Sequence, residues 1–427
     1  MNIYFSGLAG TGIGPLAELA HDAGHRIFGS DQSTGAIVSE LSEKGIQPHI
    51  GSQNGNYLRE IYDAYGIDWF VHTSALPAGH PELVLAKQLR IRCSKRDDFL
   101  SKFITEHKLQ LIAVAGTHGK TTTTSMLIWS FQQLNIPISY IVGTTLSFAD
   151  CGHFDPESKY LVYEADEYDR NFLKFHPDIA LIPSVSYDHP DIYPSKKDYI
   201  DAFKQFISQC HKVYMWPNDD AELTSQDHVH LLTDIHSELS LAGVANRANA
   251  TLAAAVIFDT FNPYSEKDAI DIDTHTINAL NLFPGSSRRF EQLIDGLYTD
   301  YAHHPDEIKA TLQMASELSD KITVVYQPHQ NTRQHEVKDG YRTAFEKAEN
   351  IFWLPTYLTR ENSDLPTLSQ SDLISELENP SIATPADLND QLLADIKTTL
   401  DNGYLVILMA AGPADGWLRE HLDYFKS

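Results

Sequence analysis

Short runs of apolar, β-branched and aromatic residues alternate along the chain with longer stretches in which apolar residues recur every three or four positions. Short apolar runs predict buried strands, and the wider spacing predicts helices with one apolar face. The predicted strands are 3–6, 26–30, 69–72, 111–114, 161–164, 179–183, 212–216, 322–326 and 404–409. Strands that alternate with helices in this way predict parallel α/β sheets.

Three segments carry the helical signal most clearly. Segment 13–20 has apolar residues at positions i, i+3, i+4 and i+7, and segment 305–315 has a similar spacing after Pro305. Residues 250–256 also read as a helix. We expect the first two of these helices to pack on the sheets.

Two segments are predicted as boundaries between α/β units. The charged stretch 102–108 precedes a buried-looking strand, and segment 283–287 is rich in turn-forming residues. The predicted domains are therefore 1–107, 108–285 and 286–427. Residues 361–390 are rich in Ser, Pro, Asp and Glu, so we expect them to form an exposed segment outside the core.

The charge balance limits the ligands that the protein can attract from a distance. Lys and Arg number 32 against 58 Asp and Glu, which gives a formal net charge of −26. This field repels polyanions, so we expect no nucleic-acid binding and no membrane-surface binding. The 427 residues hold three widely spaced cysteines and neither a signal-peptide pattern nor a spanning apolar run, so we expect a cytoplasmic protein. We expect a monomer or a weak homodimer.

A first glycine cluster lies directly after the first predicted strand. Gly7, Gly10 and Gly12 precede the predicted helix, and Asp31 ends the second strand. Bare N–H groups at such a turn favour a phosphate, but Ala9 breaks the usual dinucleotide-binding spacing. Two interpretations stay open: a site for a nucleotide or nucleotide sugar, and a tight turn without a ligand.

A second loop carries a sharper signal. It follows strand 111–114 and reads Gly116, Thr117, His118, Gly119, Lys120, Thr121, Thr122. Gly119 lets the backbone wrap phosphate oxygens, Lys120 can reach the β- and γ-phosphates, and the Thr121 hydroxyl can join a Mg²⁺ shell. We predict a shortened phosphate-binding loop.

Two further segments offer ligands for a cation on those phosphates. Glu164 opens an acidic stretch that ends at Asp169, and His189 follows Asp188 after the next predicted strand. Both segments come at the carboxyl ends of strands, where ligands gather in parallel sheets. The alternatives are a solvated acidic loop for Glu164 and a packed turn histidine for His189.

Together these motifs resemble the Mur ligases of peptidoglycan synthesis, along nearly the whole chain. The matching segments are Gly7 to Gly12, 29–31, 72–76, 80–82, 116–122, 164–167, 188–189, 288–290, 300–305, 327–329 and 409–412. So many matches in order are very unlikely by chance. The acidic motif also resembles that of the branch that recycles a whole tripeptide.

The resemblance implies a three-domain ligase with a Rossmann-like first domain for the UDP-sugar, a central phosphate-loop ATPase-type domain and a Rossmann-like third domain for the amino acid. It implies ATP, Mg²⁺, and an amide formed between the lactyl carboxylate of UDP-N-acetylmuramate and L-alanine through an acyl phosphate. One alternative is the recycling ligase that adds the L-Ala-γ-D-Glu-diaminopimelate tripeptide. A remote alternative is an inactive nucleotide-binding regulator.

The resemblance also assigns residues to roles. It implies catalytic roles for Lys120, Glu164, His189, His303 and Arg289. ATP would contact residues 116–122 with Asn246 and Asn249, and Mg²⁺ would contact Thr121, Glu164 and His189. The substrates would contact Gly7, Gly10, Gly12, Asp31, Ser74, Tyr301 and Arg333. Helix capping is the alternative for the two asparagines and for His303 before Pro305.

Three positions depart from the family pattern. Ala245 stands where the family usually has histidine, and Ala410 where it has glycine. Gln330 stands where the members that use L-alanine often carry an arginine, so one guanidinium, that of Arg333, remains to bind the amino-acid carboxylate.

Overall fold

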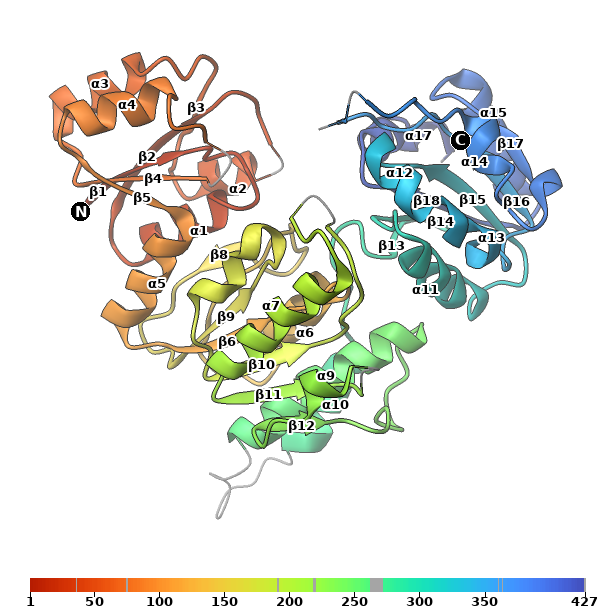
Figure 1. Ribbon diagram of the computed structural model, residues 1–427, viewed down its shortest axis with the longest axis horizontal. Coiled ribbons are helices and arrows are strands. Elements are labelled where there is room, and N and C mark those ends of the chain that lie inside the picture. Colours follow the sequence, from red (N-terminus) through yellow and green to blue (C-terminus); the bar gives the residue numbers. More distant parts are fainter. Residues whose placement is uncertain are drawn as a thin grey trace. The chain divides into compact units, whose positions relative to one another are not determined.

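The computed structural model describes residues 1–35, 37–73, 76–189, 192–217, 220–261, 272–359, 361–362 and 364–425. These residues form three α/β sheets, which confirms the predicted fold class (Figure 1). The chain divides into two compact units: Met1–Leu239 with Ala248–Pro284, and Ser240–Arg247 with Gly285–Ser427. The division into domains 1–107, 108–285 and 286–427 stays a prediction. Among the described residues, no helix has the length and apolar character needed to cross a membrane.

The first sheet contains five parallel strands in the order β3-β2-β1-β4-β5. Its strands are β1 Asn2–Ser6, β2 Arg26–Asp31, β3 His49–Ile50, β4 Trp69–His72 and β5 Arg92–Lys95. Its helices are α1 Gly14–Asp22, α2 Val38–Glu43, α3 Asn56–Tyr65, α4 Pro81–Gln88 and α5 Arg96–His107. The strand order reverses between β1 and β4, so the first glycine cluster follows a strand at the switch point, where such sheets bind ligands.

The second sheet has the strand order β12-β11-β10-β6-β9-β7-β8, and only the β7–β8 pair is antiparallel. Its strands are β6 Gln110–Val114, β7 Ser139–Ile141, β8 Gly152–His153, β9 Tyr160–Glu164, β10 Ile179–Ile182, β11 Lys212–Met215 and β12 Val229–Leu231. Its helices are α6 Lys120–Gln133, the 3₁₀ helix η1 Tyr168–Lys174, α7 Lys196–Gln209, α8 Ala221–Thr224, α9 Val244–Phe261 and α10 Ile272–Asn281. Because β6 lies between β10 and β9, the segments that follow these three strands meet at one edge.

The third sheet has the order β13-β14-β18-β15-β16-β17, with β13 antiparallel to β14 and the other pairs parallel. Its strands are β13 Glu291–Ile294, β14 Leu297–Asp300, β15 Ile322–Gln327, β16 Asn350–Trp353, β17 Ala383–Pro385 and β18 Leu405–Ala410. Its helices are α11 Pro305–Ser316, α12 Asn331–Val337, η3 Lys338–Gly340, α13 Tyr341–Ala344, α14 Gln370–Ile374, η4 Pro380–Ile382, α15 Asp390–Asp401, α16 Ala414–Glu420 and α17 Leu422–Phe425.

One expectation about a segment is corrected. Residues 361–390 do not lie entirely outside the core. Strand β17 pairs with β16, and the side chains of Leu373, Ile374 and Leu377 are buried in the core of the third sheet. The charged stretch 102–108, predicted as a boundary, lies at the end of α5 and before β6. Its residues up to His107 form the second half of α5, whose apolar side chains are buried in the first core.

The first two sheets meet at a seam between α1 and β8. Glu18 is fully buried in α1, and its Oε2 accepts a hydrogen bond from the Gly152 N–H at 2.7 Å. Lys44 Nζ lies 3.0 Å from Asp22 Oδ1 and 3.1 Å from Asp150 Oδ2, which ties α1 to the loop before β8. A Cβ at Gly152 would lie 2.0 Å from the Pro15 carbonyl oxygen, so the two backbones touch directly.

Candidate active site

The predicted phosphate loop joins β6 to α6 and is fixed by the segment that follows β10. The Thr117 hydroxyl donates to the Ser186 carbonyl at 2.8 Å, and the His118 N–H donates to Ser184 Oγ at 2.9 Å. Gly119 has φ +83°, and a Cβ there would lie 2.9 Å from Asn249 Oδ1. The loop is therefore held in shape, with Asn249 against its last glycine.

Lys120, the first residue of α6, lies in a buried charge cluster. Its Nζ donates to the Gly116 carbonyl at 2.6 Å and lies 3.0 and 2.8 Å from the two carboxylate oxygens of Glu167, which has no exposed surface. Glu167 Oε1 also lies 3.5 Å from His189 Nε2. Burial disfavours both charges, but the mutual attraction prevails: the pKa of Lys120 is raised and the pKa of Glu167 is lowered.

Thr121 and Glu164 form a second contact at the same edge. The Thr121 hydroxyl donates to Glu164 Oε1 at 2.7 Å, and the Gly143 N–H donates to Glu164 Oε2 at 3.1 Å. A hydroxyl beside a carboxylate is the oxygen donor set that Mg²⁺ prefers, and an imidazole can serve as a further ligand. The donor chemistry of Thr121, Glu164 and His189 therefore fits the cation predicted for this loop.

The first glycine cluster forms a hydrogen-bonded turn above the first sheet. The N–H groups of Gly7 and Leu8 donate to the Ser30 carbonyl at 2.9 and 3.0 Å. Asp31 Oδ2 accepts from the Ala9 N–H at 3.0 Å, so the Asp31 carboxylate holds the turn itself. Ser74, also predicted to contact the substrate, lies outside the described residues.

In the second unit, β14 and β15 both neighbour β18, and the segments after them bring His303 and Arg333 together. His303 Nδ1 donates to the Tyr301 carbonyl at 3.0 Å and lies 3.3 Å from Glu307 Oε2. Arg333 NH1 donates to His303 Nε2. Since a guanidinium can only donate, the imidazole carries its proton on Nδ1 and accepts at Nε2.

Arg289 lies beside the same group. Its guanidinium carbon is 5.1 Å from the centroid of the Tyr301 ring, within cation–π range. Asp300, at the end of β14, accepts hydrogen bonds from the N–H groups of Phe290 and Ala302, both at 2.7 Å. Burial raises the pKa of Asp300 to about 6, although the charge of Arg289 opposes this shift.

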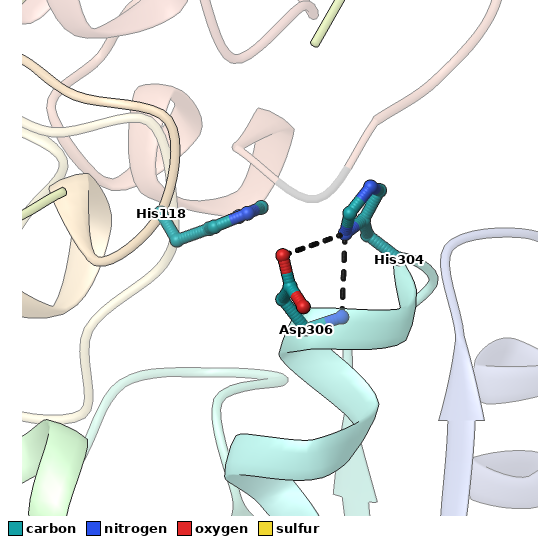
Figure 2. Close-up of side chains that lie close together, drawn as sticks. All are labelled: His118, His304 and Asp306. Carbon is teal, nitrogen blue, oxygen red and sulfur yellow. Dashed lines mark hydrogen bonds and ion pairs between the residues drawn. The ribbon is translucent and has the colours of Figure 1, made fainter. Parts of the chain in front are cut away.

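The capping interpretation of His303 is wrong by one residue. The N-cap of α11 is His304, whose Nδ1 accepts from the Asp306 N–H at 3.3 Å, while Glu307 accepts from the N–H groups of His303 and His304. Figure 2 shows the His304 imidazole above the first turn of α11, with dashed lines to Asp306; His118, also drawn, belongs to the phosphate loop of the other unit. His303 therefore does not cap α11; its side chain contacts Tyr301, Glu307 and Arg333.

The asparagine pair is split between the two units. Both residues lie inside α9, so the helix-cap interpretation is wrong. Asn249 belongs to the unit with the phosphate loop, whereas Asn246 belongs to the other unit, where it donates to the Ala242 carbonyl at 3.1 Å and contacts the sulfur of Met314 at 3.4 Å.

Two of the departures from the family pattern have clear positions. Ala410 ends β18, is fully buried, and its carbonyl accepts from Arg288 NH2 at 2.6 Å. Gln330 is the N-cap of α12 with φ 60°, and its N–H donates to the Tyr357 carbonyl at 2.9 Å.

Glu167 is the site residue that sequence reasoning missed; its place in the acidic stretch was the only signal.

The fold and the cluster around Lys120 define a phosphate-loop α/β protein. Two family models match the chain: "Mur ligase family, catalytic domain" over residues 2–108 and "Mur ligase middle domain" over residues 114–230. The chain belongs to the Mur ligase family.

Named relatives extend this likeness over nearly the full length. The UDP-N-acetylmuramate–L-alanine ligase of Clostridium novyi is 30% identical and covers 96% of this chain and 94% of its own. The ligase of the same name from Lactiplantibacillus plantarum is 30% identical, with coverages of 99% and 98%. The solved structure of the UDP-N-acetylmuramate-alanine ligase from Thermotoga maritima shares the fold, with a TM-score of 0.79 at 22% identity and coverages of 100% and 99%.

Proposed function

We propose that the protein joins L-alanine to the lactyl carboxylate of UDP-N-acetylmuramate, with cleavage of ATP to ADP and phosphate, in the synthesis of peptidoglycan precursors. The observation that carries this proposal is the full-length match, at about 30% identity, to relatives named for this ligation. The cluster of Lys120, Thr121, Glu164 and Glu167 supports it, because phosphoryl transfer needs cations and oxygen ligands at one point.

The residues of the first unit act by positioning and by neutralising charge. ATP with Mg²⁺ supplies the phosphoryl group that activates the substrate carboxylate. Lys120 and Asn249 lie at the loop that would hold the nucleotide, and Thr121, Glu164 and His189 are the residues that would hold the cation. Lys120 lowers the cost of bringing two anions together, since it is already fixed where negative charge must build up.

The second unit would bind the amino acid. Arg333 offers the guanidinium for its carboxylate, and Tyr301 and Arg289 line the same group. His303 accepts from Arg333 through Nε2, so we assign it the role of orienting Arg333 rather than that of a free base. The free amine then attacks the activated carboxyl carbon, phosphate leaves, and an amide remains.

Two alternative functions are a tripeptide ligase and an inactive regulator, and one experiment distinguishes both from the proposed function. The tripeptide ligase shares the Glu164 to Asp169 motif, and an inactive regulator would have no reason to retain the buried pair of Lys120 and Glu167.

We propose a cytoplasmic location, because the three cysteines Cys93, Cys151 and Cys210 are unpaired. A monomer or weak homodimer stays a prediction.

Phosphate release from Mg·ATP tests the proposal. UDP-N-acetylmuramate is present throughout, and L-alanine, glycine, L-serine or the L-Ala-γ-D-Glu-diaminopimelate tripeptide is added separately. We expect release with L-alanine, and less with glycine or L-serine. Release with the tripeptide alone would assign the chain to the recycling reaction, and no release with any acceptor would reject a ligase acting on this sugar nucleotide.

A further inference from the structure

Helix α12 carries Arg333 in its first turn, and the residue before the helix supplies no cap. Gln330, at the N-cap position, has φ 60°, and its side chain makes no hydrogen bond to the helix end. The first N–H groups of an α-helix have no partner inside the helix. Those of Asn331 and Thr332 therefore need acceptors from another part of the chain.

Glu361 supplies both acceptors. Its Oε1 accepts from the Asn331 N–H and its Oε2 from the Thr332 N–H, each at 3.0 Å. Oε1 also accepts from the Thr359 N–H at 2.9 Å, which fixes the carboxylate against its own loop. A negative charge is favourable at this end of a helix, because the helix dipole is positive there. Glu361 thus caps α12 in place of Gln330.

The segment that follows Glu361 is also bound to α12. The Asn331 side chain connects the two: its Oδ1 accepts from the Leu368 N–H at 2.9 Å, and its Nδ2 donates to the Pro366 carbonyl at 3.1 Å. Asn331 is only 2% exposed, so water competes little for these bonds. The polar segment that was expected to lie outside the core therefore holds the helix that carries Arg333.

A buried chain of hydrogen bonds holds the next residue of α12. Gln334, which follows Arg333, has no exposed surface. Its Nε2 donates to the His329 carbonyl at 3.0 Å, and its Oε1 accepts from the Tyr341 hydroxyl at 2.5 Å. The backbone is thus fixed on both sides of Arg333, since Glu361 holds the residues before it and Gln334 anchors the residue after it.

We propose that Glu361 is a positioning residue for the amino-acid substrate, because it fixes the turn from which Arg333 reaches the substrate carboxylate. The inference rests on the proposed function for the role of Arg333. A guanidinium binds a carboxylate through two parallel N–H donors, and this geometry is favourable only when the backbone that carries it is fixed beforehand. With Gln330 in place of a second arginine, the chain depends on that single guanidinium.

The same contacts exclude a second way of binding the substrate. Two N–H groups at a helix end can themselves receive a carboxylate. In α12 both are already bonded to Glu361, so recognition of the substrate carboxylate depends on the side chain of Arg333.

Steady-state kinetics of the full-length protein test the proposal. Glu361→Ala removes both acceptors and is expected to raise the KM for L-alanine about fivefold to tenfold, with kcat and the KM values for UDP-N-acetylmuramate and Mg·ATP within about twofold. Glu361→Gln keeps one acceptor oxygen and should give an intermediate KM. Glu346→Gln, at an exposed glutamate of the same unit, is the matched control.

A double-mutant cycle distinguishes positioning from a general effect on the fold. In the Arg333→Ala protein, Glu361→Ala should lower kcat/KM for L-alanine no further, because both residues act through the same contact. An equal loss in both backgrounds would overturn the proposal. An unchanged KM for L-alanine in the single variant, or an equal rise of all three KM values, would overturn it as well.

Hydrogen exchange separates this inference from the proposed function. In Glu361→Ala, a peptide that spans the start of α12 should exchange the Asn331 and Thr332 amides about tenfold faster than in the wild type, with α15 unchanged. If phosphate release fails with every acceptor, the ligase assignment falls, while this exchange still decides whether Glu361 fixes the turn that carries Arg333. Unchanged exchange at both amides would overturn the inference whatever the protein ligates.

Discussion

Glu167, which has no exposed surface, holds the ammonium of Lys120 at 2.8 Å, and its carboxylate also faces His189. The lysine that the sequence assigns to a phosphate is thus paired with a carboxylate of its own chain. A bound phosphate would have to compete with, or share, that contact. Glu167 is therefore a positioning residue for two groups of the site.

Replacement of Glu167 by Gln tests this relationship. The amide keeps the shape but leaves the Lys120 charge buried without its partner, and breaking a buried pair costs about 3 kcal/mol or more. We expect a lower Tm without nucleotide and a larger rise in Tm with Mg·ATP than in the wild type, because the phosphates supply the missing negative charge. Glu157→Gln, at an exposed glutamate, is the control. An equal Tm deficit with and without nucleotide would contradict this account.

Lys120→Ala should abolish most of the turnover. It removes the cation fixed at the point where negative charge builds up, and the loss of one such group lowers kcat by about 100- to 1,000-fold or more. Phosphate release and ADP formation measure the effect, and circular dichroism checks the fold. Near-normal ADP production would show that Lys120 takes no part in the chemistry.

Gln330→Arg should lower the KM for the amino acid. It restores a second guanidinium near Arg333, and we expect the KM for L-alanine to fall about tenfold at similar kcat. Gln330→Lys, which adds charge without the planar fork, should have a smaller effect. The backbone hydrogen bond from residue 330 to Tyr357 is kept in both variants. A KM that is unchanged or higher would mean that other groups recognise the carboxylate.

Glu18→Gln should stabilise the protein at alkaline pH. Burial raises the pKa of Glu18 from 4.5 to about 8; Lys44 opposes the shift, and Glu40 and Asp150 add to it. The unfolded chain ionises first, so the wild type loses stability between pH 4.5 and about 8. The amide avoids this loss and can still accept from Gly152. Urea unfolding should show a gain on the order of a few kcal/mol near pH 8.5 and a small one near pH 5; equal gains at both pH values would rule out ionisation as the cause.

The sequence predicted nine of the strands, and the glycine-rich loop after 111–114, because these signals are local. Short apolar runs mark 3–6 and 111–114, and the glycines with Lys120 mark the loop. Residues 361–390 misled because polar residues outnumber the few apolar ones, such as Leu373 and Leu377, that fill the core. Composition averages over a segment, whereas packing depends on single positions.

The partners within the site could not be predicted, because they depend on strand order. The segments after β9, β6 and β10 meet only because these strands are neighbours in the sheet. Within the acidic stretch, geometry alone distinguishes Glu164 on Thr121, Asp166 beside Arg96 and Glu167 on Lys120. Neither Arg96 nor Glu18 stands out in the sequence, since charged residues on helices usually face solvent.

The seam between α1 and β8 also limits how this chain can be recombined with its relatives. At Gly152 the contact is made by the Pro15 carbonyl, so there is no side chain on either side that a compensating substitution could trim. The buried carboxylate of Glu18 adds a hydrogen bond that only a backbone at the same position can satisfy. A chimaera that takes its first sheet from a relative should therefore take α1, α2 and the β7–β8 hairpin from that same relative.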